Sequence, residues 1–342
     1  MESPLPFNPG GPGESGKLFG LPFTIETAEI VIIPVPWEVT VSYRHGTQEG
    51  PSAILEASVQ TDLYVSDIKD AWKLGVVLMD ENIFIKTESI RLRNLYHDRK
   101  NINQTIKHEI NQGCLQMVNY VRHVAKSIIK KAKIPAVLGG DHSTPLGLIQ
   151  ALGAKYRSFG ILQIDAHADL REEYEGFSYS HASIMHNVLK INAVNKLVQV
   201  GIRDFCEEEA QIIENAQTRI KLHSDKLIKE KMFQGTNWSE ICKTVIDELP
   251  DRVYISFDID GLQPYLCPNT GTPVPGGLSF EMAAFLISQI VLDGKEIIGF
   301  DLCEVAPGNN PEDEWDANVG ARMLYHLINW TGVSRGKLFS GL

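Results

Sequence analysis

Cysteine is scarce in this chain, and its spacing excludes two common kinds of site. Only five cysteines occur among 342 residues, and no two of them form a Cys-x-x-Cys pair. An odd number without that spacing fits neither a disulfide framework nor a thiolate zinc site. We therefore expect a reduced protein of the cytoplasm.

Long apolar runs and an excess of positive charge are also missing. The N-terminus is acidic and rich in proline and glycine, unlike a signal peptide, and no stretch is long and apolar enough to span a membrane. The chain carries 32 Lys and Arg residues against 43 Asp and Glu residues, which gives a net charge of −11. This balance argues against nucleic acid as the main partner. We expect contact with neither nucleic acid nor membrane.

The remaining composition predicts a globular protein with a short irregular arm. Hydrophobic residues make up 43% and charged residues 22% of the chain, enough to build a large core. Residues 1–20 contain four prolines and five glycines and have no pattern of a regular element. We divide the chain into an N-terminal arm, residues 1–25, and a single domain, residues 26–342.

Strands alternate with helices along the domain, which predicts an α/β fold with about eight strands in a mostly parallel sheet covered on both faces. Apolar runs predict strands at 29–36, 74–79, 134–139, 159–165, 196–202, 218–222, 252–258 and 297–303. Helical spacing predicts helices at 102–131, 181–190, 206–215, 237–248, 279–292 and 316–331, with another that opens at Ser143-Thr144-Pro145.

Three of these apolar runs end in side chains that can bind metals. The segments 134–142, 159–169 and 253–260 each begin as a buried strand and finish in His or Asp. The carboxyl ends of parallel strands meet at one edge of a sheet, where ligands bind. The expected ligands are His142, Asp165, His167, Asp169, Asp258 and Asp260.

The chemistry of this set favours a pair of divalent ions. Carboxylates and imidazoles without thiolate suit Mn²⁺, Ni²⁺, Co²⁺ or Fe²⁺ better than structural zinc. Four carboxylates offset the charge of two such ions. Two adjacent metals can share a water and lower its pKa toward about 7, which supplies a hydroxide nucleophile at neutral pH. The bridging hydroxide would leave the cluster with a charge of about −1, which a cationic substrate would suit.

The same residues resemble the three signatures of the ureohydrolase (arginase/agmatinase) family. The matching segments are Gly139–Ser143, Asp165–Asp169 and Ser256–Leu262, with further similarity at Gly271–Gly277 and Asp301–Val305. The resemblance implies a three-layer α/β/α sandwich around an eight-stranded parallel sheet. It also implies a hydrolase that cleaves a C–N bond of a small cationic guanidine to give urea, with two Mn²⁺ or Ni²⁺ ions per chain. Gln263 departs from the family, which commonly has Asp there, beyond the ligands.

The resemblance assigns a role to each site residue. One metal would be held by His142, Asp165, Asp169 and Asp258, and the other by Asp165, His167, Asp258 and Asp260, so Asp165 and Asp258 would bridge. Asp169 would orient the attacking hydroxide, Glu304 would pair with the guanidinium, and His181 would relay a proton to the leaving nitrogen. Asp141 would support the site by hydrogen bonding from behind the ligands.

The identity of the guanidine is less strongly marked. Cys206 stands where arginases tend to place an acid, which disfavours arginine, and residues 169–183 resemble agmatinase-like members. The N-terminal segments 18–23 and 35–43 resemble guanidine hydrolases, a nickel-using branch that acts on free guanidine. We therefore expect free guanidine first, agmatine or another guanidinoalkyl compound as the alternative, and formiminoglutamate as a distant third.

The aromatic N-terminal part has two interpretations. Phe19, Phe23 and Trp37 could narrow the mouth of the site, with Trp37 and Thr40 touching substrate, or the aromatic rings could pack in a core or at a subunit contact. The family further implies a homo-oligomer, a trimer or hexamer, and a metal-delivery chaperone if the metal is nickel. A metal-dependent deacetylase and a non-enzymatic metal-binding protein are rival classes. The first usually has fewer carboxylates, and the second would need a broken site.

Overall fold

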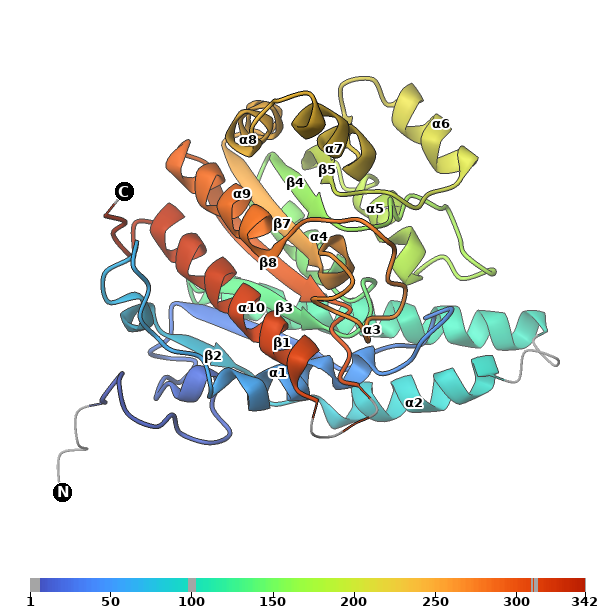
Figure 1. The fold of residues 1–342 in the computed structure, drawn as a ribbon. Helices are drawn as coiled ribbons and strands as arrows, with labels where there is room; N and C mark the ends of the chain where they lie inside the picture. The colour runs from blue at the N-terminus through green and yellow to red at the C-terminus, as the bar shows by residue number, and fades with distance from the viewer. Residues whose placement is uncertain (1–6, 98–102, 309, 311–312, 342) are drawn as a thin grey trace.

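The fold is a single eight-stranded sheet in which every strand pairs with its neighbours in parallel (Figure 1). The computed structural model describes residues 7–97, 103–308, 310 and 313–341. The strand order is β2-β1-β3-β8-β7-β4-β5-β6. The strands are β1 (Ile30–Val35), β2 (Val76–Leu78), β3 (Ile134–Gly139), β4 (Phe159–Ile164), β5 (Val194–Val200), β6 (Ile220–His223), β7 (Arg252–Asp258) and β8 (Glu296–Cys303). This confirms the predicted α/β class with its eight-stranded sheet.

Helices cover both faces of the sheet and complete three layers (Figure 1). One face is covered chiefly by α1 (Gly50–Ser58), α8 (Trp238–Asp247), α9 (Phe280–Leu292) and α10 (Trp315–Ser334). The other is covered chiefly by α2 (Ile83–His97), α3 (Gln104–Lys130), α4 (Leu146–Lys155) and α5 (Ile184–Val188). The remaining helices are α6 (Glu207–Asn215) and α7 (Asp225–Phe233). Because both faces are covered, β1, β3 and β4 are buried along their whole length, which explains their continuous apolar runs.

The structure corrects the predicted helices in detail. It adds α1, α2 and α7, in segments for which the sequence predicts no element. The helix expected over 102–131 begins at Gln104, and residue 102 lies outside the described residues. The helix expected to open at Ser143-Thr144-Pro145 instead has a turn there and begins at Leu146, with Pro145 at the position before it.

The N-terminal arm packs against the sheet edge formed by β2. Leu18, Phe19 and Leu21 are buried in the core shared by α1 and α10. The backbone N–H of Phe19 donates to Ser58 Oγ at 2.8 Å, and its ring centroid lies 4.9 Å from that of Tyr325. The described part of the arm therefore packs in the core, as the second interpretation of its aromatic residues predicts. The first six residues of the expected arm lie outside the described residues.

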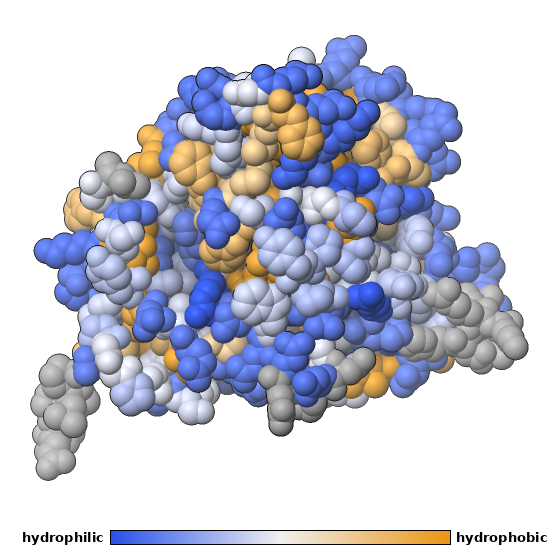
Figure 2. Space-filling model, in the orientation of Figure 1, coloured by the Kyte–Doolittle hydropathy of each residue, from blue (hydrophilic) through white to orange (hydrophobic). Residues whose placement is uncertain are grey.

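The surface is mainly polar, as the charged fraction leads one to expect. On the face in Figure 2, hydrophilic side chains surround separate apolar patches. Within the described ranges, no helix has both the length and the apolar character needed to cross a membrane.

The packing of the arm predicts a large effect of a single truncation. Phe19 is 2% exposed, so Phe19→Ala should lower the free energy of unfolding by about 3–5 kcal/mol, as for other buried Phe→Ala changes. Phe233, which is 86% exposed on α7, provides the control. Phe233→Ala should change the free energy of unfolding by less than about 0.5 kcal/mol. Urea denaturation measures both. Equal, small effects would show that the arm does not contribute to the core.

Candidate metal centre and active site

The turn after β3 brings His142 to the centre of the sheet edge. Gly140 has no space for a side chain, because a Cβ there would lie 2.2 Å from the carbonyl oxygen of Trp37. The next N–H, that of Asp141, donates to the same carbonyl at 2.8 Å. Glycine thus lets the chain pass close to the loop after β1 and turn toward the neighbouring strands. His142 follows directly and is 1% exposed.

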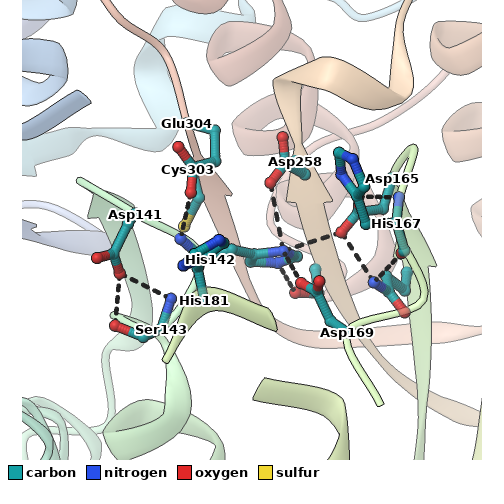
Figure 3. Close-up of polar contacts among 12 residues, drawn as sticks. Asp141, His142, Ser143, Asp165, His167, Asp169, His181, Asp258, Cys303 and Glu304 are labelled. Atoms are coloured by element: carbon teal, nitrogen blue, oxygen red, sulfur yellow. Dashed lines mark hydrogen bonds and ion pairs between the residues drawn. The ribbon is translucent and has the colours of Figure 1, made fainter. Parts of the chain in front are cut away.

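Three carboxylates from β4 and β7 surround one ring nitrogen of His142 (Figure 3). The distances from His142 Nδ1 are 2.9 Å to Asp165 Oδ2, 3.2 Å to Asp169 Oδ2 and 3.4 Å to Asp258 Oδ2. All three Asp side chains are buried, and Asp169 has a left-handed backbone with φ 55°. Residues far apart in the sequence therefore form one compact set of ligand atoms.

A second group of ligand atoms shares a member with the first. His167 Nδ1 lies 3.1 Å from Asp260 Oδ2 and 3.6 Å from Asp165 Oδ1. Two clusters suited to metal ions result, one of His142, Asp165 and Asp169 and the other of Asp165, His167 and Asp260. The two oxygens of Asp165 face different clusters, which is the arrangement that a bridging carboxylate requires.

The hydrogen bonds of His142 test whether a cation fits. Its Nε2 lies 2.8 Å from Ser256 Oγ, and Ser256 donates to Asp301 Oδ1 at 3.3 Å. Since that hydroxyl proton goes to Asp301, the ring proton belongs on Nε2, and Nδ1 keeps its lone pair. Nδ1 is buried and has no hydrogen-bond partner among the described residues. A lone pair beside three carboxylates is an environment that a divalent cation completes.

Polar side chains inside the strands hold the ligands from behind. Gln163 Nε2 donates to Asp165 Oδ2 at 2.8 Å, and Gln199 Nε2 donates to Gln163 Oε1 at 2.7 Å. The sequence reading gave no role to these glutamines, to Ser256 or to Asp301. Each interrupts an apolar strand, and a polar residue in a fully buried strand is the signal that could have found them.

Burial and crowding shift the pKa values of the ligands. Burial, with the charge of Asp165, raises the pKa of Asp169 to about 7, and burial beside Asp260 and Asp165 raises that of Asp258 well above its usual range. Burial pulls the pKa of His142 down, but the carboxylates of Asp165 and Asp169 beside Nδ1 outweigh it and raise that pKa well above normal, so that without a cation the ring would bind a second proton there. The site thus carries more negative charge than a buried pocket tolerates without cations.

Glu304 lies beside this set at the end of β8. Its Oε1 accepts a hydrogen bond from the backbone N–H of His142 at 2.9 Å, and its own N–H donates to Gly140 at 2.9 Å. Its backbone is left-handed, with φ 63°, and Thr270 Oγ1 donates to its carbonyl at 2.8 Å. Burial, and the nearby charge of Asp141, raise the pKa of Glu304 well above its usual range. The structure therefore places a buried carboxylate at the cluster, with Oε2 on the side of Gly271.

Asp141 supports the turn that carries His142. Its Oδ1 accepts hydrogen bonds from the N–H and the hydroxyl of Ser143, and its carbonyl accepts from the N–H of Thr144. Burial raises the pKa of Asp141 to about 6, although the Ser143 hydrogen bonds oppose the shift. Asp141 thus acts on the backbone of the turn rather than on a ligand side chain.

The two residues expected to touch substrate lie in different surroundings. Thr40 Oγ1 is 3.4 Å from Nδ1 of His181, and His181 lines the site cavity. The ring of Trp37 is fully buried in the core between the sheet and α3. The structure therefore brings Thr40 to His181 but gives Trp37 a packing position, so Trp37 does not enter the proposed site.

A cavity of about 160 Å³ opens beside the second ligand group. Its lining residues are Ser42, His167, Asp169, Arg171, Tyr174, His181, Ala182, Asp204, Phe205, Glu209 and Thr272. Sequence reasoning missed most of the outer ones, because they lie in loops without regular spacing. None of the described lining residues belongs to the N-terminal arm. Arg171 Nε lies 3.8 Å from Glu209 Oε2, and the central guanidinium carbon of Arg171 lies 5.2 Å from the centroid of the Tyr174 ring.

Comparisons with known proteins agree with this geometry. A profile described as "Arginase family" matches residues 28–329. The N(1)-aminopropylagmatine ureohydrolase of Thermus thermophilus is 29% identical over 92% of this chain and 94% of its own length, and the agmatinase of Bacillus anthracis is 28% identical over 92% and 97%. Among solved structures, the proclavaminate amidino hydrolase of Streptomyces clavuligerus shares the fold, with a TM-score of 0.73 and 19% identity over 93% of this chain and 97% of that one. From the extent of the profile match, the chain belongs to the arginase family.

Proposed function

We propose that this enzyme hydrolyses a guanidinoalkylamine of the agmatine type to urea and an amine, using two divalent metal ions. Membership of the arginase family makes it a hydrolase of C–N bonds in amidino groups. The observation that carries the proposal is the double ligand cluster that shares Asp165, with the buried Glu304 beside it. We further propose that the chain consists of an N-terminal arm, residues 1–25, and one catalytic domain, residues 26–342.

The ligand residues would hold the metals as the family pattern implies. His142, Asp165, Asp169 and Asp258 would bind one ion, and Asp165, His167, Asp258 and Asp260 the other. When bound, such a pair supplies an acidified water and positive charge at the reacting carbon. The donor set accepts Mn²⁺ and Ni²⁺ alike, so both are carried into the experiments.

Three side chains of the chain act on the substrate itself. The Glu304 carboxylate can accept two parallel N–H bonds from a planar guanidinium, a strong and oriented contact. Asp169 accepts a hydrogen bond from the attacking water and fixes its direction. His181, in the cavity wall, presents a ring N–H to the leaving nitrogen.

A substrate with an amine tail replaces free guanidine, which is the first expectation from the sequence. Free guanidine is expected from the resemblance of segments 18–23 and 35–43 to guanidine hydrolases and from an aromatic arm that could close the pocket, but the described arm packs at β2 and away from the cavity lining. The relatives are named for agmatine and N(1)-aminopropylagmatine, which both carry an amine tail. In the outer cavity the positive charge of Arg171 is balanced by the carboxylate of Glu209, and Asp204 adds a further carboxylate. An amine tail suits this excess of negative charge.

Four earlier expectations stay predictions. They are the cytoplasmic location, the trimeric or hexameric assembly, the metal-delivery chaperone and the choice between nickel and manganese.

The bridging role of Asp165 predicts loss of metal. Asp165→Asn removes a charge and a ligand from both clusters, so affinity should fall by more than the roughly 10–100-fold that follows loss of an outer hydrogen-bond partner. Elemental analysis of dialysed protein should find well below two ions per chain. Asp316→Asn, at a buried carboxylate of α10 bonded to Asn269, should keep the wild-type metal content. Two ions in the Asp165 variant would rule out bridging.

The contact proposed for Glu304 predicts a loss of activity without a loss of metal. Glu304→Gln keeps the shape but removes the charge that faces the guanidinium. We expect kcat/KM to fall by roughly 10–100-fold, the equivalent of about 1.5–3 kcal/mol, at unchanged metal content. Steady-state urea release on the metal-loaded enzyme measures this. A wild-type kcat/KM would mean that another group binds the cation.

A panel of substrates tests the proposed tail. Urea release is measured for agmatine, its neutral-tailed isostere pentylguanidine, 4-guanidinobutanoate, arginine and free guanidine, after separate loading with Mn²⁺ and Ni²⁺. Agmatine should have the highest kcat/KM, because it alone in the panel combines the guanidinium with a tail of net positive charge that suits Asp204. Faster hydrolysis of guanidine than of agmatine at equal concentration would restore the closed-pocket interpretation.

A further inference from the structure

The loop after β1 reaches the cavity and places a buried hydroxyl against His181. Thr40 is 2% exposed. The backbone N–H of His181 donates to Thr40 Oγ1 at 3.3 Å, and the same oxygen lies 3.4 Å from Nδ1 of the His181 ring. One threonine hydroxyl therefore contacts both the main chain and the side chain of His181.

These two contacts fix the direction of the hydrogen bonds. The hydroxyl oxygen already accepts from the backbone N–H of His181. If Nδ1–H also donated to it, the hydroxyl proton of Thr40 would have no other acceptor within reach in the described part of the chain. A buried donor without a partner costs about 1–3 kcal/mol. The favoured arrangement has the hydroxyl donating to Nδ1, so the ring proton of His181 sits on Nε2.

A buried arginine from α2 holds the loop on both sides of Thr40. Arg93 is 5% exposed, and its Nη1 donates to the carbonyl of Val39 at 3.0 Å and to that of Val41 at a shorter distance. Its Nη2 lies 2.7 Å from Nδ1 of His45. The two carbonyls that flank Thr40 are thus bound to one nitrogen, Nη1, of a guanidinium whose other terminal nitrogen contacts His45.

Tyr174 limits the ring of His181 from another direction. The two rings meet edge to face, with centroids 5.9 Å apart and planes at 82°. With Nδ1 against Thr40 and Tyr174 beside the ring, we assign the edge that carries Nε2 to the cavity that His181 lines. The held proton therefore points to where a leaving nitrogen would lie.

We propose that Thr40 is a positioning residue that holds His181 as the tautomer with its proton on Nε2, directed into the cavity, and that Arg93 holds Thr40 in place. This inference rests on the proposed function, in which His181 serves the leaving nitrogen. It gives Thr40 a role other than the substrate contact expected from the sequence.

The charges around His181 agree with a neutral ring. Burial is the main cause that lowers the pKa of the His181 ring to about 3, and the positive charge of Arg93 acts in the same direction. Thr40 and Tyr174, the other two groups against the ring, are uncharged. A neutral ring needs its tautomer fixed if it is to present a donor on one chosen side.

Isosteric substitution of Thr40 tests the proposal by kinetics. Thr40→Val removes the hydroxyl and keeps the shape, so kcat for agmatine should fall by about 10–100-fold, as expected for a misplaced catalytic group, with KM nearly unchanged. Thr40→Ser restores the hydroxyl and should recover most of the loss. Thr331→Val is the matched control, since the Thr331 hydroxyl is buried in α10 without a partner among the described residues. It should keep the wild-type kcat. A fall in Thr40→Val that Thr40→Ser does not recover, or an unchanged kcat, overturns the proposal.

Ring ¹⁵N chemical shifts of His181 test the tautomer without relying on activity. In histidine-labelled, metal-loaded protein, with His181 assigned by the His181→Asn variant, wild type should show a protonated Nε2 and an unprotonated Nδ1. Thr40→Val should lose this pattern, and Thr331→Val should keep it. A protonated Nδ1 in wild type overturns the proposal. If wild type releases no urea from any guanidine, the proposed function fails, and the ¹⁵N shifts alone decide the position of the proton.

The role of Arg93 has a separate test. Arg93→Lys keeps the charge but has one nitrogen in place of the planar guanidinium, so it loses the Nη2 contact with His45 and the fixed direction of the two Nη1 bonds, and it should lower kcat and disturb the His181 shifts in the same direction as Thr40→Val. If Arg93→Lys lowers only the melting temperature and leaves both readouts at wild-type values, Arg93 stabilises the loop without positioning Thr40, and that part of the proposal is wrong.

Discussion

Buried carboxylates that crowd together repel one another, and the active-site architecture follows from this constraint. Two like charges 4 Å apart repel by about 4 kcal/mol at an effective dielectric constant of 20. Asp165, Asp169 and Asp258 all lie within 3.4 Å of one His142 nitrogen, and all are buried. Cations between them turn the repulsion into attraction. Metal binding and the local fold are therefore coupled, since the pocket gains its full stability only with the ions in place.

The topology of the sheet explains why distant segments can build this pocket. Strands β3, β8, β7 and β4 are consecutive neighbours at the centre of the sheet, and all run parallel. Their carboxyl ends thus form one row, which supplies His142, Glu304, Asp258 and Asp165 in turn. Buried polar residues one layer below fix the geometry. Ser256 and Asp301 orient His142 from β7 and β8, as Gln163 orients Asp165 from β4.

The sequence was sufficient for the features that depend on local patterns. Buried parallel strands are continuous apolar runs, so all eight were found, and the expected ligands end three of them. Helix α2 was not predicted, because its face toward the core is narrow. Leu92 and Tyr96 are buried, while other apolar residues such as Phe84 and Ile90 are exposed. Gln163 holds Asp165 from within its own segment, but Gln199 reaches Gln163 from the neighbouring strand β5, and no spacing within one strand encodes that contact. The structure brings the expected ligands together, and their binding of metal stays a prediction.

The same limit explains why the substrate was harder to infer than the reaction. Reaction chemistry follows from residue types at strand ends, whereas specificity depends on which loops reach the cavity. Aromatic residues such as Phe19 and Trp37 suggested a wall, yet both rings are buried in the core, on opposite faces of the sheet. An aromatic run near a terminus has more to gain from burial than from lining a wet pocket. Thr40 shows the converse, since only the loop held by Arg93 brings its hydroxyl to His181. In this chain the small polar residue of a loop held by a buried arginine therefore reaches the site, and the two large aromatic residues do not.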